Sequence, residues 1–454
     1  MSVETINNSE ARQQRFTVVV LGDLGHSPRI INQALSLSTL PGAHVDIVGY
    51  KGSPLPAQVN DKENIDVYYI SPPPALGPGL LSICYLLFAP IKAFLMLCAL
   101  LSQLIQAPAS DYVLVQNPPA IPTLLVAQLI CFFRGSQLII DWHNFGYSIL
   151  ALKFGFHHPI VKLAHVYEWV FGCDAYAHIT VTQAMAHELK NVWKVEGKIV
   201  VLHDRAPSGF QKLTTNEVHA TLVELEKSQP EFASLASFFW LQEANSSNCP
   251  EATLLTTTSH NGPQFRANRP YLLVSSTSWT PDEDFDMFLE ALIGYNEQAK
   301  LSSDYGRLAV VITGKGPDRA KFEETLAELQ MEHVKIILAW LPLELYPRLL
   351  GSADLGVSLH ASSSGLDLPM KVVDMLGTGL PICALDFNCM GELVSNNENG
   401  LLFSSAAELT AHLEYLFAGR NAAAHLENLR RGAAKFGDIR WQPHWEANFK
   451  PLVC

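Results

Sequence analysis

The stretch that decides the fold is Gly365-Leu-Asp-Leu-Pro-Met-Lys-Val-Val-Asp374, which continues through Met375-Leu-Gly-Thr-Gly-Leu-Pro-Ile-Cys383. A turn rich in Ser and Gly leads into a helix, and Gly-Leu-Pro then marks the passage from the helix to a buried strand. The free N–H groups and the positive dipole end of a helix N-terminus suit an anion such as a diphosphate. Lys371 would add a positive charge there, and Asp374 could accept hydrogen bonds from sugar or ribose hydroxyls. The alternative is an ordinary buried β-α-β unit with one solvated lysine.

Short apolar runs alternate with helical patterns on both sides of this stretch. In the second half of the chain we expect strands at 271–276, 308–313, 334–338, 355–359 and 381–385. In the first half we expect them at 16–21, 45–50, 65–70, 112–116, 137–142, 178–182 and 198–202. Such alternation is typical of doubly wound parallel sheets. We therefore predict an α/β fold with two Rossmann-like doubly wound domains that face a central cleft.

Length and composition fit two domains in a reducing compartment. The chain has 454 residues, a formal net charge of −13 and eight scattered cysteines without a Cys-x-x-Cys pair. Because phosphate backbones demand a dense basic surface, this charge argues against a nucleic-acid partner. Met1 to Phe16 is polar, which predicts no secretory signal peptide. The expected segments are a polar tail at 1–15, a first domain at 16–210, a linker or insertion at 211–268, a second domain at 269–430, and a C-terminal segment at 431–454 that packs back toward the first domain.

One apolar segment, at 80–106, predicts contact with a membrane. It is long enough to cross a bilayer, which takes about 20 apolar residues. Pro90 interrupts it, however, and Lys92 places a charge near its middle. We expect an interfacial or re-entrant helical hairpin, with a pair of core helices as the alternative. A second run, at 121–133, is too short to span and predicts a packed helix.

Candidate catalytic residues of the first domain follow the expected strands. His143, within Asp141-Trp-His-Asn-Phe-Gly-Tyr147, is our first choice of general base, because a neutral imidazole titrates near cellular pH. Asp141 or Asn144 could orient its ring, and a hydrogen-bonded structural histidine is the alternative. The rival base is His26. The further candidates for acceptor or phosphate binding are Gly22, Asp23, Gly25 and Asn144.

The second domain offers candidate donor-binding residues at matching places. Ser276 and Thr277 follow one expected strand, and Gly314-Lys315-Gly316 follows the next. A Gly-Lys-Gly turn can present backbone N–H groups and one cation to a diphosphate, although a plain tight turn is an equal alternative. With Lys371 and Asp374, these residues form our predicted donor site.

Several longer strings resemble the chitobiosyldiphosphodolichol β-mannosyltransferase family. The strings are Gly22-Asp-Leu-Gly-His-Ser-Pro-Arg29, Asp141-Trp-His-Asn-Phe-Gly-Tyr-Ser148, Ser275-Ser-Thr-Ser-Trp-Thr-Pro-Asp-Glu-Asp-Phe285, Gly365 to Asp374, and Glu398-Asn-Gly-Leu401. The resemblance covers nearly the whole chain. It implies a GT-B fold, an acceptor-binding first domain and a GDP-mannose-binding second domain.

The resemblance also implies the reaction and its partners. The first mannose would pass with inversion, as a β-1,4 linkage, from GDP-mannose to dolichyl-diphosphate chitobiose on the cytosolic face of the endoplasmic reticulum membrane. Other early glycosyltransferases of the dolichol pathway are further candidate partners. No cofactor or metal would be required, with assistance by a divalent cation such as Mg²⁺ left open.

Within the GT-B motif Asp374 stands where many members have the second of two glutamates. Asp367, one residue after the first such position, joins the catalytic candidates. An N-terminal membrane anchor is also expected of this family. The alternatives are a GT-B transferase that uses another nucleotide sugar and a non-catalytic GT-B-like scaffold.

Overall fold

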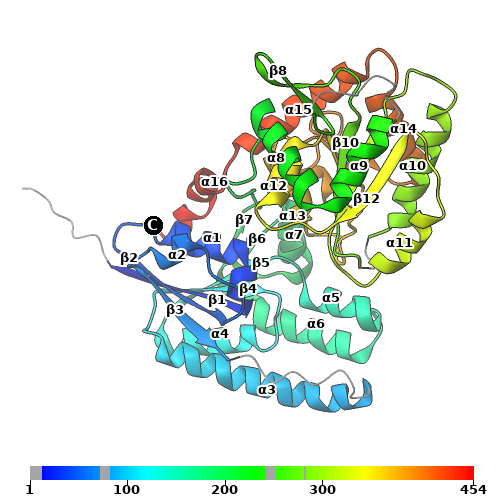
Figure 1. Cartoon of the computed structure of the whole chain (residues 1–454). Coiled ribbons are helices and arrows are strands. Elements are labelled where there is room, and N and C mark those ends of the chain that lie inside the picture. Colours follow the sequence, from blue (N-terminus) through cyan, green and yellow to red (C-terminus); the bar gives the residue numbers. More distant parts are fainter. Residues whose placement is uncertain (1–12, 72–81, 242–251, 281–282) are drawn as a thin grey trace, which may run out of the picture. The chain divides into compact units, whose positions relative to one another are not determined.

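The computed structural model describes residues 13–71, 82–241, 252–280 and 283–454. The chain divides into two compact units. Unit 1 comprises Met1–His203 together with His444–Cys454, and unit 2 comprises Asp204–Pro443. Each unit is built on its own parallel sheet (Figure 1).

Unit 1 contains a seven-stranded parallel sheet in the order β3-β2-β1-β4-β5-β6-β7 among its described residues. The strands are β1 (Gln14–Asp23), β2 (Ala43–Tyr50), β3 (Ile65–Ile70), β4 (Tyr112–Asn117), β5 (Gln137–Trp142), β6 (Asp174–Thr180) and β7 (Glu196–Val201). Their middles are continuous apolar runs, such as the buried Val18 and Val19 of β1, because helices cover both faces of the sheet. From β1 the chain adds β2 and β3 on one side and β4 to β7 on the other, so the switch point of the strand order lies between β1 and β4. Ligands of such sheets bind at the carboxyl ends of the strands beside the switch point.

Helices cover both faces of this sheet (Figure 1). They are α1 (Pro28–Leu37), α2 (Ala57–Asn60), α3 (Ser82–Gln106), α4 (Thr123–Arg134), α5 (Gly146–Phe154), α6 (Pro159–Gly172) and α7 (Gln183–Glu188). On one face α4 packs on β4 and β5, with α3 and α6 beside it, while α1 packs on β1 and β2. The last residues of the chain also belong to unit 1: Trp445 is fully buried, and its indole N–H donates to the side chain of Gln33 at 2.8 Å.

Unit 2 contains a six-stranded parallel sheet in the order β12-β11-β10-β13-β14-β15 among the described residues. The strands are β10 (Tyr271–Ser276), β11 (Leu308–Thr313), β12 (Val334–Ala339), β13 (Leu355–Ser358), β14 (Ile382–Leu385) and β15 (Gly400–Phe403). The helices around them are α10 (Phe285–Ala299), α11 (Arg319–Ala327), α12 (Leu345–Ser352), α13 (Met370–Gly377), α14 (Ala406–Phe417) and α15 (Ala422–Asp438), and α16 (Trp441–Asn448) follows. Here the switch point lies between β10 and β13. The predicted fold class, with two doubly wound parallel sheets, is confirmed.

The segment at 211–268, for which we predicted a linker or insertion, carries regular secondary structure and belongs to unit 2. It forms α8 (Thr215–Ser228), α9 (Pro230–Leu241) and the antiparallel hairpin of β8 (Thr256–Ser259) and β9 (Gly262–Phe265). Leu222, Leu225 and Phe239 are fully buried in a core shared with β10 and β11. A capping box between Thr214 and Glu217 starts α8, and this signal was present in the sequence. The polar residues around 245–264 favoured a loop, so the apolar spacing of the two helices was not recognised.

The predicted helical hairpin at 80–106 is wrong, because the described part of this segment, α3 (Ser82–Gln106), is one helix with Pro90 inside it. A proline removes its own backbone donor, while the other i→i−4 hydrogen bonds of a long helix remain. In the part of the chain that the structure describes, no helix has both the length and the apolarity needed to cross a membrane. The run at 121–133 does form the predicted packed helix, α4. The boundaries of the two domains also differ from those we expected, since unit 2 begins at Asp204 and α15 extends the same unit past 430.

Candidate active site

The loop after β1 is organised by the carboxylate of Asp23. It accepts hydrogen bonds from the backbone N–H groups of Gly25 and Ser53, both at 3.0 Å, and lies 2.8 Å from Nδ1 of His26. These bonds, led by the one from the Ser53 backbone, lower the pKa of Asp23 to about 2. A side chain at Gly25 would meet the carbonyl oxygens of Ser53 and Pro54, so the loop requires glycine there. Asp23 therefore stabilises the conformation of this loop, and the side chain of His26 is exposed to solvent.

His143 lies beside a buried carboxylate at the end of β5. Its Nε2 is 3.4 Å from Oδ2 of Asp141, which suits an ion pair when the ring is protonated. Asp141 is fully buried and accepts hydrogen bonds from Arg29 at 2.9 Å and from Gln33 at 3.1 Å. Burial alone would raise the pKa of Asp141, but the positive charges of Arg29 and His143 more than reverse this effect and hold the pKa low. Asp141 is therefore placed to orient the imidazole of His143, as the third group does beside a general base.

Asn144 has a structural task at the start of α5. Its side-chain oxygen accepts a hydrogen bond from the backbone N–H of Phe145 at 2.7 Å. Behind it the buried Glu168 accepts bonds from the N–H groups of Gly146 at 2.8 Å and Tyr147 at 3.1 Å, and from the side chain of Asn117 at 2.6 Å. Burial raises the pKa of Glu168, while these three bonds oppose the rise. Glu168 thus ties α6 to the loop that carries His143, a role that sequence reasoning missed.

In unit 2 the loops after β10 and β11 approach each other closely. A Cβ on Gly314, whose φ is +150°, would lie 1.8 Å from the carbonyl oxygen of Thr277, and one on Gly316 equally close to that of Ser278. The backbone N–H of Thr277 donates to the carbonyl of Thr313 at 2.9 Å. Lys315 points its ammonium over the ring of Trp340 at 4.4 Å from the centroid. Both glycines are therefore required by backbone packing, as expected for a turn that presents its main chain to a ligand.

Lys371 is paired with Glu283, a residue that we did not single out. The ammonium of Lys371, in the first turn of α13, contacts one carboxylate oxygen of Glu283. The other oxygen accepts hydrogen bonds from the hydroxyl of Thr277 at 2.6 Å and from the backbone N–H of Ser278 at 2.9 Å. The pair therefore joins the end of β10 to the start of α13. No local sequence signal marks this partnership, since the two residues are 88 positions apart.

Asp374 lies on α13, one helical turn after Lys371. Within the described residues no hydrogen bond to its carboxylate is formed, and burial, followed by the nearby charge of Asp204, raises its pKa to about 8. Tyr346 lies beside it, and the Tyr346 hydroxyl is 2.9 Å from that of Ser276. Asp367, by contrast, accepts bonds from the hydroxyls of Ser362 and Ser364 within its own turn. The structure thus gathers Ser276, Thr277, Lys371 and Asp374 and leaves Asp367 tied within its turn.

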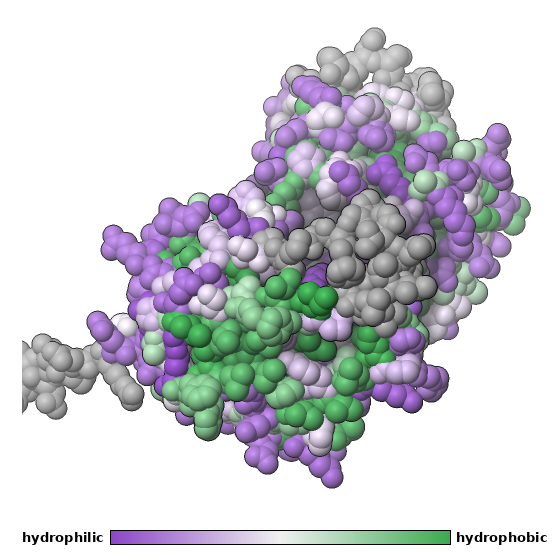
Figure 2. Space-filling model, turned by 90° about the horizontal axis from the view of Figure 1, so that it is seen from below, coloured by the Kyte–Doolittle hydropathy of each residue, from purple (hydrophilic) through white to green (hydrophobic). Residues whose placement is uncertain are grey.

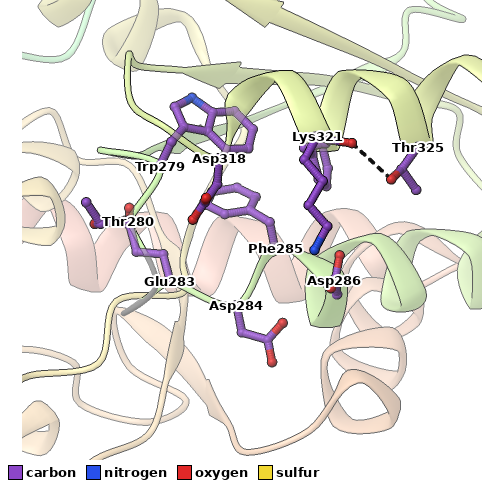
Figure 3. Close-up of a pocket in the computed structure, with 10 residues that line it drawn as sticks. Trp279, Thr280, Glu283, Asp284, Phe285, Asp286, Asp318, Lys321 and Thr325 are labelled. Carbon is purple, nitrogen blue, oxygen red and sulfur yellow. Dashed lines mark hydrogen bonds between the residues drawn. The ribbon is translucent and has the colours of Figure 1, made fainter. Parts of the chain in front are cut away.

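A cavity of about 320 Å³ opens between α10 and α11, and Glu283, the partner of Lys371, lines it (Figure 3). Glu283, Asp284, Asp286 and Asp318 line it, against a single cation, Lys321. Four carboxylates would repel a diphosphate, so we do not assign the donor's phosphates to this cavity.

Among the described residues, one group has the spacing of metal ligands, namely His44, Asp46 and Asp66, at the amino ends of β2 and β3. Asp46 is already paired with Arg15 there.

Comparison with known proteins begins with the fold. The chain superposes on HepE from Anabaena, solved with UDP and glucose, with a TM-score of 0.59 at 14% identity, and the match covers 94% of this chain and 95% of that one. Residues 269–418 match a family model described as glycosyl transferases group 1. Together with the two sheets, this match defines the class of the protein: a glycosyltransferase of the GT-B fold.

Closer relatives identify the family. The chain is 41% identical to the UDP-glycosyltransferase TURAN of Arabidopsis thaliana, over 97% of both chains. It is 38% identical to the chitobiosyldiphosphodolichol beta-mannosyltransferase of Mus musculus, over 98% of this chain and 90% of that one. The chain belongs to the chitobiosyldiphosphodolichol β-mannosyltransferase family, as its sequence strings indicated.

Proposed function

We propose that this enzyme transfers the first mannose from GDP-mannose to dolichyl-diphosphate chitobiose, with inversion, to form a β-1,4 linkage. The mouse relative is named for β-mannosyl transfer to this acceptor. The single observation that carries the chemistry is the cluster at the end of β10 and the start of α13. There the ammonium of Lys371, in the first turn of α13, and the hydroxyl of Thr277 both contact Glu283, and the hydroxyl of the neighbouring Ser276 lies 2.9 Å from that of Tyr346.

Unit 2 supplies the groups that suit a nucleotide diphosphate. Lys371 offers a cation in the first turn of α13, where the helix dipole also favours negative charge. This charge stabilises the leaving GDP, which departs with two phosphates and no proton from the protein. The carboxyl group of Asp374 is held largely protonated at neutral pH by burial, and it offers a hydrogen-bond donor or acceptor to a ribose or sugar hydroxyl. Lys315 and the turn around it remain a prediction for the same ligand.

Unit 1 supplies the candidate base. In an inverting transfer the acceptor hydroxyl attacks the anomeric carbon of mannose directly, and one base removes its proton as the bond to GDP breaks. His143 is our candidate, because Asp141 stays ionised beside it and is fixed by Arg29. His26 remains the rival. We propose no required metal, and assistance by a divalent cation such as Mg²⁺ is for the assay below to decide.

The proposed place of action is the cytosolic face of the endoplasmic reticulum membrane. The cysteines that the structure describes are free thiols, which agrees with a reducing compartment. Other early enzymes of the dolichol pathway are candidate partners, since they handle the lipid before and after this step.

The deciding experiment is transfer from radiolabelled GDP-mannose to phytanyl-diphosphate chitobiose by the purified protein. We expect a trisaccharide lipid that β-mannosidase degrades. The assay is run with and without EDTA, and with UDP-glucose and UDP-N-acetylglucosamine as competing donors, because the Arabidopsis relative carries a UDP-glycosyltransferase name. Transfer from a UDP-sugar alone would replace our donor. GDP binding without transfer from any donor would favour a non-catalytic scaffold.

A further inference from the structure

Trp279, in the loop after β10, has a backbone conformation that bulky residues rarely adopt. Its φ is +51°, in the left-handed region that glycine favours. The side chain is 2% exposed, and its ring packs on those of Phe285 and Phe322, with centroids at 4.8 and 5.2 Å (Figure 3). Strained residues of this kind persist where surrounding contacts impose the conformation, and they gather at ligand sites. The polar contacts of Trp279 show which parts of unit 2 it holds.

The indole of Trp279 is bonded to the turn after β11. Its Nε1–H donates to the carbonyl of Gly314 at 3.3 Å. Just after this turn, the backbone N–H of Asp318 donates to the carbonyl of Trp279, also at 3.3 Å. A Cβ on Gly316 would lie 2.7 Å from the Cβ of Trp279, so the middle of the turn is equally close. Trp279 therefore fixes where the main chain of the turn lies.

The backbone of Trp279 begins a chain of contacts that ends at Lys371. Its N–H donates to the hydroxyl of Thr277 at 2.7 Å, and that hydroxyl donates to one carboxylate oxygen of Glu283 at 2.6 Å. The other carboxylate oxygen contacts the ammonium of Lys371. Because Thr277 and Glu283 are buried, their polar groups depend on these partners. The main chain of Trp279 thus helps to hold the residue that places Lys371.

We propose that Trp279 is a positioning residue of the predicted donor site, which fixes the turn after β11 and the ammonium of Lys371 relative to each other. A diphosphate carries charge on both phosphates, so the main-chain N–H groups and the cation that bind it must stand at matching places. Since the contacts of Trp279 hold both, the ligand does not have to order them on binding. The inference rests on the proposed function, whose donor supplies the diphosphate.

Trp279→Phe tests the contact with the turn. It keeps an aromatic ring between Phe285 and Phe322 and removes the N–H that bonds to Gly314. We expect the affinity for GDP, measured by calorimetry, to fall about three- to tenfold, because the turn loses one hydrogen bond that holds it. The KM for GDP-mannose should rise by the same factor, and the KM for the phytanyl acceptor should not change. Trp240→Phe, the same exchange on α9 of unit 2, should leave GDP affinity unchanged.

Two substitutions of Thr277 test the chain of contacts to Lys371. Thr277→Val has nearly the same shape without the hydroxyl, whereas Thr277→Ser keeps the hydroxyl. We expect Thr277→Val to weaken GDP binding about tenfold, and Thr277→Ser to recover most of this loss. In a protein that carries Lys371→Ala, Thr277→Val should weaken GDP binding by less than about twofold, since the chain ends at Lys371. Equal losses in both backgrounds would show that Thr277 contacts the nucleotide itself and would refute the chain.

Wild-type GDP affinity in Trp279→Phe would overturn the proposal, because the indole would then only fill the core. Lower stability in chemical denaturation with an unchanged GDP affinity of the folded variant would lead to the same conclusion. The proposed reaction fails separately. A wild type that binds GDP without transferring mannose would contradict the reaction, and the affinities of the variants would still decide the role of Trp279. If the wild type binds UDP in place of GDP, the same ratios are measured with UDP.

Discussion

Arg29 shows how a single residue sets the electrostatics of unit 1. Its guanidinium is buried and holds Asp141 through two nitrogens, and a further N–H reaches the carbonyl of Leu202 at 2.9 Å. A buried carboxylate without such a partner would take up a proton. With Arg29 in place, Asp141 stays charged and faces His143. The candidate base is thus prepared by a residue of α1 that is distant in sequence.

The first prediction at this scale concerns His143. His143→Ala should lower kcat by about 10²–10⁴-fold, because proton removal from the acceptor loses its positioned base. The KM for GDP-mannose should change little, since the donor groups lie in unit 2. Steady-state kinetics with the phytanyl acceptor measure both constants. His26→Ala serves as the comparison, and a large loss of kcat there with normal turnover in His143→Ala would move the base to His26.

The second prediction concerns Lys371. Lys371→Ala should weaken GDP binding by about ten- to a hundredfold, because a charge-assisted contact to phosphate contributes about 1.5–3 kcal/mol. Calorimetry with GDP measures the loss. The substitution also leaves the buried Glu283 without its cation, so the double variant Lys371→Ala with Glu283→Gln separates that effect from ligand binding. Lys321→Ala, in the acidic cavity, should bind GDP normally. Unchanged affinity in Lys371→Ala would remove Lys371 from the donor site.

The third prediction concerns Asp374 and pH. Its pKa is about 8 in the folded chain against 3.8 for the free side chain, so the folded state keeps a proton that the unfolded state has released. The free energy of unfolding of unit 2 should therefore fall as pH rises from about 4 to about 8. Asp374→Asn should remove this contribution and make unit 2 more stable than wild type at pH 8. Urea titrations of the ligand-free protein across this range measure the slope, and the exposed Asp438→Asn should preserve it. An unaltered slope in Asp374→Asn would contradict the assignment.

At the scale of elements, the close approach of two loops shapes the predicted donor site. The loop after β11 lies against the loop after β10 at Gly314 and Gly316, where no side chain fits. Gly314 also has a positive φ, a region that glycine adopts without strain. Parallel pairing of β10 with β11 brings both loops to one edge of the sheet. The turn motif in the sequence therefore reflects packing between elements as much as ligand binding.

Gly314→Ala tests this packing. Its Cβ would overlap the carbonyl of Thr277, so unit 2 should lose about 2 kcal/mol or more of stability, and GDP binding should weaken as the loop shifts. Chemical denaturation and calorimetry measure the two effects. Gly391→Ala is the control, because a Cβ there meets open space. A Gly314→Ala protein as stable as wild type would show that the loops part without cost.

At the scale of the whole molecule, the chain returns to unit 1 after completing unit 2. His444–Cys454 belongs to unit 1, where the hydroxyl of Tyr176 donates to the carbonyl of Leu452 at 2.8 Å and the side chain of Gln14 donates to that of Val453 at 2.9 Å. Unit 1 is therefore incomplete without the end of the chain. Two units of this size can unfold in separate transitions, so a single unfolding temperature would not describe the protein.

Trp445→Ala tests the contribution of the chain end. The buried indole stacks on Phe449 and bonds to Gln33, so its loss should cost about 3–5 kcal/mol in the unfolding of unit 1. Hydrogen exchange should show faster opening of β1 and α1, with the strands of unit 2 unchanged. Phe156→Ala, at an exposed position of unit 1, should have little effect. Equal acceleration in both units would contradict the division at His444.

The sequence by itself determined the two parallel sheets, because buried parallel strands are continuous apolar runs that local patterns reveal. It also determined the family, through the long strings at Gly22, Asp141, Ser275 and Gly365. The sequence pattern did not predict α8 and α9, because the polar residues that follow them favoured a linker or loop for the whole segment.

Only the tertiary structure decided which groups meet. The pairs of Lys371 with Glu283 and of Asp141 with Arg29 join residues far apart in sequence. The burial and the nearby charge of Asp204 that raise the pKa of Asp374 likewise come from the packing of distant segments. The exposed apolar residues of α4 and α6 (Figure 2) likewise needed the structure, since a second apolar side of a helix is distinguished from its core side only by what covers it. Local patterns specify elements, but pairing, burial and exposure depend on the packing of elements distant in sequence.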